Sequence, residues 1–341
     1  MIKQPLVSVV TPFYNTAPYL RECIESVLAQ SYDNFEYLLV DNQSSDGSAE
    51  IAKEYAANDP RIRLIRNTEF VGQVRNFNGA LRHVAPAARY VKMVLADDYI
   101  FPECLARMVA VAEAHPTAAI ISSYYLKGAG VCGSGIEYPS DCIPGRLASR
   151  LHLLDGHFLF GTPTTLMYRA DIVAKRQPFF SESSPHEDTE LCHEVMAEAD
   201  LGFVHQVLSF VRVGNEGILT SIDTFNWEML DFYISLKKFG PVFLSEEEFA
   251  DRMQTARAEY MTMLGESRVL GREPAFWAYH EKGLAAVGED LPSLLDLTPK
   301  VTRAVLKAFV RPKWFLREKT RLNSRRARAG RNGNSHTGAG Q

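Results

Sequence analysis

The chain has 341 residues, of which 46% are hydrophobic and 23% are charged, a composition typical of a soluble globular protein. This length is enough for one large α/β domain with an appendage. No apolar run approaches the roughly 18 residues that a membrane span needs. The five cysteines are odd in number and lack C-x-x-C spacing, which disfavours a disulfide framework and a zinc site. We therefore expect reduced thiols in a cytoplasmic protein, and the opening MIKQPLVSVV predicts no signal peptide.

The net charge of −4 hides a strong asymmetry along the chain. Residues 300–331 carry twelve Lys or Arg against one Glu, which leaves 25 Lys or Arg against 40 Asp or Glu elsewhere. The body of the protein is therefore acidic and its C-terminal end is strongly basic. A basic segment on an acidic protein suggests attachment to an anionic partner or surface, which bears on the location of the protein in the cell.

Short apolar runs alternate with helical patterns through the first 122 residues. Buried strands are predicted at 7–10, 35–40, 61–65, 90–95 and 118–122, and helices at 19–28, 51–55, 72–83 and 102–115. This alternation predicts an α/β fold with a mostly parallel sheet flanked by helices on both faces.

The regular alternation weakens after residue 123. Residues 128–145 are rich in Gly, Pro and Ser and predict a loop or lid, followed by strands at 166–168 and 203–207 with a helix at 190–199. From residue 225 to about 294 the pattern is helical throughout. We therefore predict three parts: an α/β domain at 1–222, a helical C-terminal region with a basic amphipathic end at 223–320, and a disordered basic tail at 321–341.

Polar residues follow several of the predicted strands. Asp41 closes the second strand, and the adjacent acids Asp97 and Asp98 follow the fourth. In open α/β sheets, ligands bind at the carboxyl ends of the strands. Two neighbouring acids repel each other unless a cation or hydrogen bonds compensate, and a divalent metal that carries a phosphate is the usual cation. The pattern predicts nucleotide chemistry at this edge.

Five motifs follow one another along the chain: VSVVTPFYN, LLVDNQSSDGS, VGQVRNFN, LADDY and HEDTEL. Their order and spacing, over roughly residues 5–215, resemble those of family 2 glycosyltransferases, which have the GT-A fold. The resemblance implies a metal-dependent, inverting transferase that uses Mn²⁺ or Mg²⁺. Such an enzyme moves a sugar from a UDP- or dTDP-linked donor to a hydroxyl of a saccharide or lipid-linked saccharide, in surface polysaccharide synthesis.

The resemblance also implies roles for individual residues. Asp188 matches the base that takes the proton from the acceptor hydroxyl, and Glu187 would orient the acceptor or a loop. Asp98 and Asp97 would bind the metal and the donor, and Asp41 would accept a hydrogen bond from a uracil or thymine N3–H. Residues 161–165 lie where relatives shape the floor beneath the sugar. The remaining implied donor contacts are Thr11, Pro12, Tyr14, Asn15, Arg75, Asn76, Asn78 and Arg212.

The sequence departs from the family pattern at two positions. Leu95 stands where many members have Asp, and Gly214 stands where many have His. The first departure leaves open which of Asp97 and Asp98 ligates the metal. Together the departures leave open a non-catalytic nucleotide-sugar-binding or scaffold protein of the same fold. A dinucleotide-dependent dehydrogenase is disfavoured because no G-x-G-x-x-G follows the first strand.

Several of these residues also have simpler structural interpretations. Asn15 or Thr16 can cap the helix that follows them, and for Asp46 we favour the capping of a helix that starts near residue 47. Glu187 and Asp188 at a helix start can merely complement the helix dipole.

The basic C-terminal end combines cations with apolar and aromatic residues. Pro312 splits it into two short predicted helices. Such segments lie in the membrane interface, with cations on anionic headgroups, so we predict peripheral attachment at the inner face of the cell membrane. Packing of this end on the acidic body is the main alternative. Nucleic acid is disfavoured because the aromatic residues lie beside aliphatic ones. The residues concerned are Lys300, Val301, Arg303, Val305, Lys307, Phe309, Val310, Arg311, Lys313, Trp314, Phe315 and Arg317.

Overall fold

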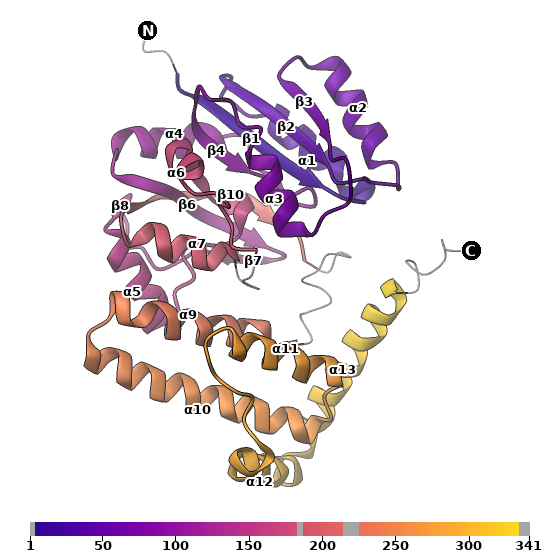
Figure 1. Ribbon diagram of the computed structural model, residues 1–341, viewed down its shortest axis with the longest axis vertical. Coiled ribbons are helices and arrows are strands. Elements are labelled where there is room, and N and C mark those ends of the chain that lie inside the picture. Colours follow the sequence, from indigo (N-terminus) through magenta and orange to yellow (C-terminus); the bar gives the residue numbers. More distant parts are fainter. Residues whose placement is uncertain (1–3, 183–186, 214–224, 334–341) are drawn as a thin grey trace. The chain divides into compact units, whose positions relative to one another are not determined.

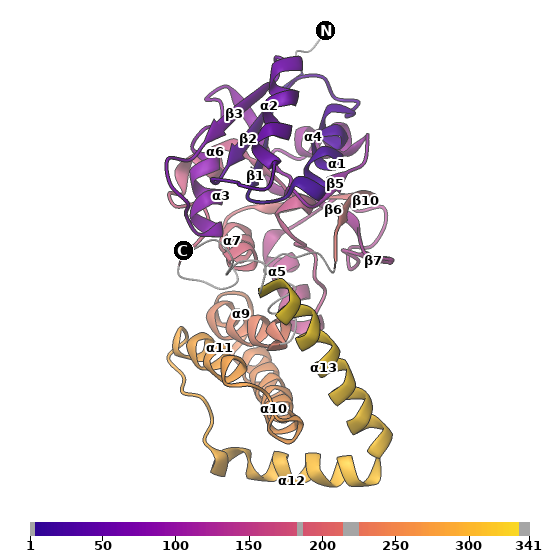
Figure 2. The ribbon, with the colours of Figure 1, turned by 90° about the vertical axis from the view of Figure 1, so that its right-hand side faces the viewer.

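The structure, a computed structural model, describes residues 4–182, 187–213 and 225–333. Contacts along the chain divide it into two compact units, residues 1–213 and 214–341, which are drawn in Figures 1 and 2. The division that we predicted after residue 222 falls outside the described residues.

The first unit is built on a sheet to which ten strands belong in the described residues. The strand order is β3-β2-β1-β4-β9-β6-β10-β5, with β7 paired to β6 and β8 paired to β10. The strands are β1 (Leu6–Phe13), β2 (Phe35–Asp41), β3 (Ile62–Arg66), β4 (Ala88–Met93), β5 (Tyr99–Ile100), β6 (Ala118–Lys127), β7 (Gly130–Cys132), β8 (Cys142–Ile143), β9 (Met167–Arg169) and β10 (Asp200–Val211).

The sheet is mostly parallel along its main path, as predicted. Strands β3, β2, β1 and β4 run parallel to one another, and β6 runs parallel to β10. The short strand β9 lies between β4 and β6 and is antiparallel to both. Parallel strands end at the same edge of a sheet, so the residues that follow β1, β2 and β4 come close together.

Helices cover both faces of this sheet, because its strands are apolar on both sides. Val9 belongs to one core cluster and Val10 to the other, as the two-residue period of a strand requires. Figure 2 shows α1 and α4 on one side of the sheet and α3 and α6 on the other. The helices are α1 (Ala17–Leu28), α2 (Ser48–Asn58), α3 (Gln73–Leu81), α4 (Cys104–Ala114), α5 (Gly145–Asp155), α6 (Ala170–Lys175) and α7 (Glu187–Met196), with a 3₁₀ turn, η1, at Pro163–Thr165.

The segment predicted as a loop at 128–145 contains β7 and β8, and helix α5 begins at its end. The sequence did not reveal α5 because its buried face includes Ala148, Ser149 and His152, which carry little hydrophobic signal. Gly145 is needed where this helix starts, because a Cβ there would lie 1.9 Å from the Ala199 carbonyl oxygen.

The second unit is helical, as predicted for residues 225–294. Its described helices are α9 (Trp227–Phe243), α10 (Glu246–Leu270), α11 (Pro274–Ala285), α12 (Leu294–Val310) and α13 (Pro312–Gly333). Ser245 caps α10 and Ser293 caps α12, each through a hydroxyl that accepts from a backbone N–H three residues on. The predicted break at Pro312 separates α12 from α13.

Helix α13 continues through residues 321–333, which differs from the disordered tail that we predicted. Arg, Ala, Lys and Leu all have high helix propensity, so a low content of apolar residues is compatible with a helix. In the part of the chain that the structure describes, none of the helices is long and apolar enough to span a bilayer.

Candidate active site

The ends of the first three strands meet at one edge of the sheet. Asp41 at the end of β2 pairs in register with Phe13 at the end of β1 and with Arg66 at the end of β3. The turn that holds Asp97 and Asp98 follows β4, which pairs with β1 on its other side. The structure therefore gathers these predicted site residues at the edge where we expected them.

Asp41 is buried and has one engaged and one available carboxylate oxygen. Its Oδ1 accepts a hydrogen bond of 2.8 Å from the Ser44 backbone N–H. Its Oδ2 lies 3.2 Å from the Arg66 Nε but accepts no aligned hydrogen bond from any described residue. A buried oxygen with spare acceptor capacity suits a donor N–H on a bound ligand.

The loop after β1 carries an exposed aromatic residue and a structural asparagine. The Tyr14 ring, 41% exposed, lies with its centroid 4.7 Å from that of Phe70, which is 59% exposed. Asn15 adopts a left-handed φ of 50° and joins this loop to the one after β2. Its side chain accepts from the Ser45 N–H at 2.8 Å, and its own N–H donates to the Ser44 hydroxyl at 3.1 Å.

Thr11 and Pro12 are both buried. The Thr11 hydroxyl donates to the Val94 carbonyl oxygen at 2.8 Å and lies 3.0 Å from the Tyr37 hydroxyl, so it ties β1 to the end of β4. This internal engagement gives Thr11 a structural role that the sequence did not indicate.

Asp46 joins the starts of two helices, in line with the capping role that we favoured. Its carboxylate accepts from the Ala17 N–H at 2.9 Å and from the Ser48 N–H at 3.0 Å, the first residues of α1 and α2. Burial raises the pKa of Asp46, but the hydrogen bonds outweigh this and the net shift is downward.

The polar residues of α3 bind two neighbouring loops. Asn78 clamps the Phe180 backbone: its amide donates to the Phe180 carbonyl and accepts from the Phe180 N–H, both at 2.9 Å. Asn76 accepts a hydrogen bond of 2.9 Å from Asn67. Arg75 and Asn78, three residues apart on α3, both contact Glu182, at 3.1 and 3.5 Å. Residue 182 lies five positions before Glu187.

Asp98 is buried, and hydrogen bonds hold its carboxylate from two sides. The Thr164 hydroxyl donates to Oδ2 at 2.6 Å, and the Arg212 backbone N–H donates to Oδ1 at 2.9 Å. Burial raises the pKa of Asp98, and the negative charge of Asp97 adds to this effect. A bound cation would relieve the repulsion between the two acids.

Arg212 connects the acidic turn to α1. Its Nε donates to the Asp97 carbonyl oxygen at 2.8 Å, and its guanidinium pairs with Glu22. The same guanidinium lies over the Tyr19 ring, 4.9 Å from the centroid. The side chain of Arg212, which the resemblance implies contacts the donor, is thus already engaged by protein groups. Gly214, the second departure from the family pattern, lies outside the described residues.

The acidic turn has a fully buried lysine beside it, on β4. The Lys92 Nζ donates to the carbonyl oxygens of Thr164 and Leu166, at 2.5 and 3.1 Å. Burial lowers the pKa of Lys92, and the negative charge of Asp98 opposes this shift. A buried ammonium is costly unless it is hydrogen-bonded, so these contacts fix the chain around η1 against β4.

Glu187 and Asp188 open helix α7 and are half-buried. The Asp188 Oδ1 accepts from the Thr189 N–H at 2.7 Å. Burial raises the pKa of both carboxyls, and for Glu187 the charge of Asp188 raises it further. Asp188 is near enough to the buried Tyr168 on β9 to raise the pKa of that phenol as well, after burial and Cys192. His186 lies outside the described residues.

The donor set of the acidic turn fits a hard divalent cation. Each oxygen of Asp98 accepts one hydrogen bond and keeps a second acceptor site. Among the described residues no three His, Cys, Asp or Glu side chains gather closely enough to hold a metal by themselves. A cation at Asp97 and Asp98 would therefore complete its coordination with phosphate oxygens and water, as Mg²⁺ typically does.

The sequence analysis did not identify four contributors to this site. Lys92 was detectable as the single charge in the predicted strand at 90–95. The Thr164 hydroxyl contacts Asp98, which the expectation for residues 161–165 did not include. Asn42 and Asn67 form an amide network with the Val71 backbone and Asn76, and nothing in their local sequence marks it.

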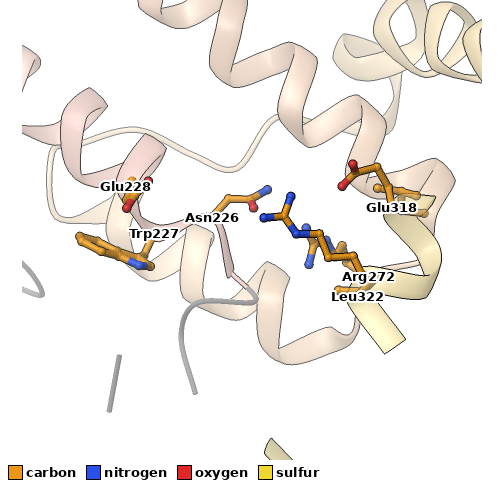
Figure 3. Close-up of a pocket in the computed structure, with 8 residues that line it drawn as sticks. Asn226, Trp227, Glu228, Arg272, Glu318 and Leu322 are labelled. Carbon is orange, nitrogen blue, oxygen red and sulfur yellow. The ribbon is translucent and has the colours of Figure 1, made fainter. Parts of the chain in front are cut away.

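A cavity of about 240 Å³ lies in the second unit (Figure 3). Arg272 and Asn226 face each other across it in the close-up, with Glu318 nearby. It contains none of the predicted site residues. Its lining residues are Asn226, Trp227, Glu228, Leu270, Arg272, Glu318, Arg321 and Leu322.

Comparisons with known proteins agree with this geometry. Residues 8–176 match the model of glycosyl transferase family 2. The putative glycosyltransferase EpsE of Bacillus subtilis is 38% identical over 147 residues, 42% of this chain and 52% of the relative. The putative teichuronic acid biosynthesis glycosyltransferase TuaG of the same organism is 38% identical over 95 residues, 28% of this chain and 37% of the relative. The chain thus spans about half, or less, of the length of these relatives.

Solved structures share the fold over nearly the whole chain. Staphylococcus aureus TarS 1–349 in complex with UDP-GlcNAc superposes with a TM-score of 0.61 at 17% identity, covering 96% of this chain and 88% of TarS. The mannosyltransferase PcManGT of Pyrobaculum calidifontis, in complex with GDP-Man and Mn²⁺, gives 0.56 at 18% identity, covering 97% and 88%. The match over residues 8–176 shows that the chain belongs to glycosyl transferase family 2, and the shared architecture shows that it has the GT-A fold.

Proposed function

We propose that this protein is an inverting glycosyltransferase that moves a sugar from a UDP- or dTDP-linked donor to a hydroxyl of a saccharide or lipid-linked saccharide. The observation that carries the proposal is the acidic turn at the sheet edge, where Thr164 and Arg212 hold the Asp98 carboxylate. The available Asp41 oxygen at the end of β2 supports it further.

Two residues, Asp41 and Tyr14, form the part of the site that would bind the nucleobase. The Asp41 Oδ2 accepts the N3–H of a uracil or thymine ring, and the exposed Tyr14 ring offers an apolar surface to that ring. The UDP-GlcNAc bound by TarS supports a uridine donor. Arg75, Asn76 and Asn78 shape the neighbouring wall by fixing the loops at Asn67 and Phe180.

The diphosphate part of the site is the acidic turn. Asp97 and Asp98 would hold a Mn²⁺ or Mg²⁺ ion, which when bound neutralises charge on the leaving diphosphate. Mn²⁺ in the PcManGT complex supports the use of a divalent metal. Arg212 fixes the turn to α1 through Glu22 and the Asp97 carbonyl, so that the acids keep their positions.

Asp188 acts as the general base. The acceptor hydroxyl oxygen forms a bond to the anomeric carbon, its proton passes to the Asp188 carboxylate, and the bond from that carbon to the diphosphate breaks with inversion. A pKa raised by burial suits this role, because a base is most effective when its pKa lies near the working pH. Glu187 orients the acceptor or the preceding loop.

A role in surface polysaccharide synthesis rests on the relatives, of which TuaG is named for teichuronic acid biosynthesis. The alternative function is a non-catalytic nucleotide-sugar-binding or scaffold protein, which Leu95 in place of the usual first acid favours. Donor hydrolysis or transfer to an acceptor panel distinguishes the two, since a scaffold binds UDP with metal but turns nothing over.

The proposal is tested by screening nucleotide-sugars for a rise in Tm with Mn²⁺ and with EDTA. We expect UDP- or dTDP-sugars to raise Tm with Mn²⁺ present, because binding to the native state alone stabilises it. GDP- and ADP-sugars serve as controls. A screen in which purine donors match or exceed the pyrimidine donors would contradict the Asp41 assignment.

We also propose that the cytoplasmic protein attaches peripherally to an anionic membrane through α12 and the start of α13. Helix α12 buries Leu297 and Ala304 but exposes Leu306, Phe309 and Val310, at 60%, 85% and 74%. Residues 306 and 310 are four apart and so lie on one helical face, next to residue 309. Lys and Arg residues occur along the same segment, and each contributes about 1 kcal/mol of attraction to a nearby anionic surface.

Deletion of residues 300–341 should abolish co-sedimentation with anionic liposomes. In the full chain, the double variant Phe309→Asp, Val310→Asp should strongly weaken co-sedimentation. It replaces two exposed apolar side chains, which would insert at the boundary of the acyl chains, with charged ones. Val242→Asp is the matched control, since Val242 is 45% exposed on α9. Sedimentation of the truncated chain equal to that of the full-length protein would refute membrane attachment.

A further inference from the structure

The Asp98 carboxylate is oriented by a residue that belongs to a distant part of the chain. Thr164, in the η1 turn, donates its hydroxyl hydrogen to the Asp98 Oδ2 at 2.6 Å. The same hydroxyl oxygen accepts the Leu95 backbone N–H at 3.0 Å. One buried hydroxyl thus bridges the start of the acidic turn and its last carboxylate.

The backbone at Thr164 is itself held in place by the side chain of Lys92 on β4. The ammonium of Lys92 donates to the Thr164 carbonyl oxygen and to that of Leu166. Lys92 is fully buried, and its pairing in register with Met167 across β4 and β9 brings the two segments together. The hydroxyl therefore has little freedom to move away from Asp98.

Thr164 engages only one acceptor site on Asp98. Because a carboxylate oxygen can accept two hydrogen bonds or ligand contacts, Oδ2 remains open to a cation while its rotation is restrained. Residues that hydrogen-bond a metal-ligating carboxylate orient it and typically influence metal affinity by about 10- to 100-fold.

We propose that Thr164 is a positioning residue for divalent-metal binding by Asp98, a role that rests on the proposed function. It acts through Asp98 and does not itself contact the donor or the acceptor. Its loss frees one side of the carboxylate, while the Arg212 N–H still bonds to the other side.

The test uses full-length protein and three single variants. Thr164→Val removes the hydroxyl with little change of shape, and Thr164→Ser restores it. Thr165→Val is the matched control: Thr165 is also buried in η1, but its hydroxyl bonds to the Phe160 and Thr162 carbonyls. The readout is the Mn²⁺ concentration that gives half of the maximal Tm rise at saturating UDP.

We expect Thr164→Val to raise this half-saturating concentration by about tenfold, equivalent to about 1.4 kcal/mol. Thr164→Ser and Thr165→Val should remain within about twofold of the wild type. Both Thr164→Val and Thr165→Val are expected to lower the Tm measured without metal, because each removes a buried hydrogen bond. Should Thr164→Val not fold, Thr164→Ala compared with Thr164→Ser decides the matter, because these two differ only by the hydroxyl.

Two negative results are distinguishable. A wild-type protein without any Mn²⁺-dependent rise in Tm would refute the proposed function and this inference together. A wild-type protein that responds to Mn²⁺, with Thr164→Val or Thr164→Ala responding at the same concentration, would refute only the positioning role.

Discussion

Replacing Asp188 by Asn should lower kcat by about 100-fold or more while the affinity for the donor stays near that of the wild type. Asn has almost the same shape as Asp but cannot take the proton of the acceptor hydroxyl, and general base catalysis contributes about 10²- to 10⁴-fold. The expected separation of kcat from donor binding is measured by steady-state kinetics and by UDP titration.

Glu187→Gln is the matched control, because Glu187 is the adjacent half-buried acid at the same helix start. Near-normal turnover in Asp188→Asn with loss of turnover in Glu187→Gln would assign the general base to Glu187.

The wild-type kcat should fall as the pH is lowered, because the general base Asp188 must be ionised to accept a proton. Burial raises its pKa, so this fall should begin above the range of an ordinary Asp.

Replacing Asp97 or Asp98 by Ala should abolish turnover and weaken UDP binding far more in Mn²⁺ than in EDTA. Removal of either acid takes away a metal ligand or a neighbouring negative charge that attracts the cation. The contact between Asp41 and the uracil or thymine ring remains, so binding in EDTA should change less. Calorimetric titration of UDP with and without metal measures the difference.

Asp155→Ala is the control for this pair, because it removes an exposed carboxylate at the end of α5 from the same unit. It should leave metal-dependent binding unchanged. If both acid variants kept wild-type binding in Mn²⁺, the assignment of the acidic turn would be wrong. Asp98→Ala should lower the Tm more than Asp97→Ala does, because it leaves the buried Thr164 hydroxyl without its acceptor.

The first half of the fold could be predicted from local patterns. Strands β1, β2 and β4 are short apolar runs because both of their faces are buried between helix layers. Once the strands are parallel, the residues after each must meet at one edge. For this reason the sequence positions of Asp41, Asp97 and Asp98 were enough to predict that they lie at one edge of the sheet.

Helix α5 and the extent of α13 were not predictable in the same way. The buried face of α5 consists mostly of small and polar residues, with Leu153 as its one buried leucine, so the apolar residues of the segment do not mark that face. Helix α13 has a low apolar content, yet its residues have high helix propensity. In both cases hydrophobic periodicity was a poor guide, because it reports burial against a core and not helix formation itself.

The sequence by itself determined the α/β class, the strand ends and the chemical types of the residues at the sheet edge, because these depend on patterns of a few neighbouring residues. Only the tertiary structure decided which residues bond to which. The Thr164–Asp98, Asn78–Phe180 and Arg212–Asp98 contacts join residues 66, 102 and 114 positions apart. Such pairings follow from the order of strands in the sheet, which places β9 and β10 beside the acidic turn, and no local pattern encodes that order.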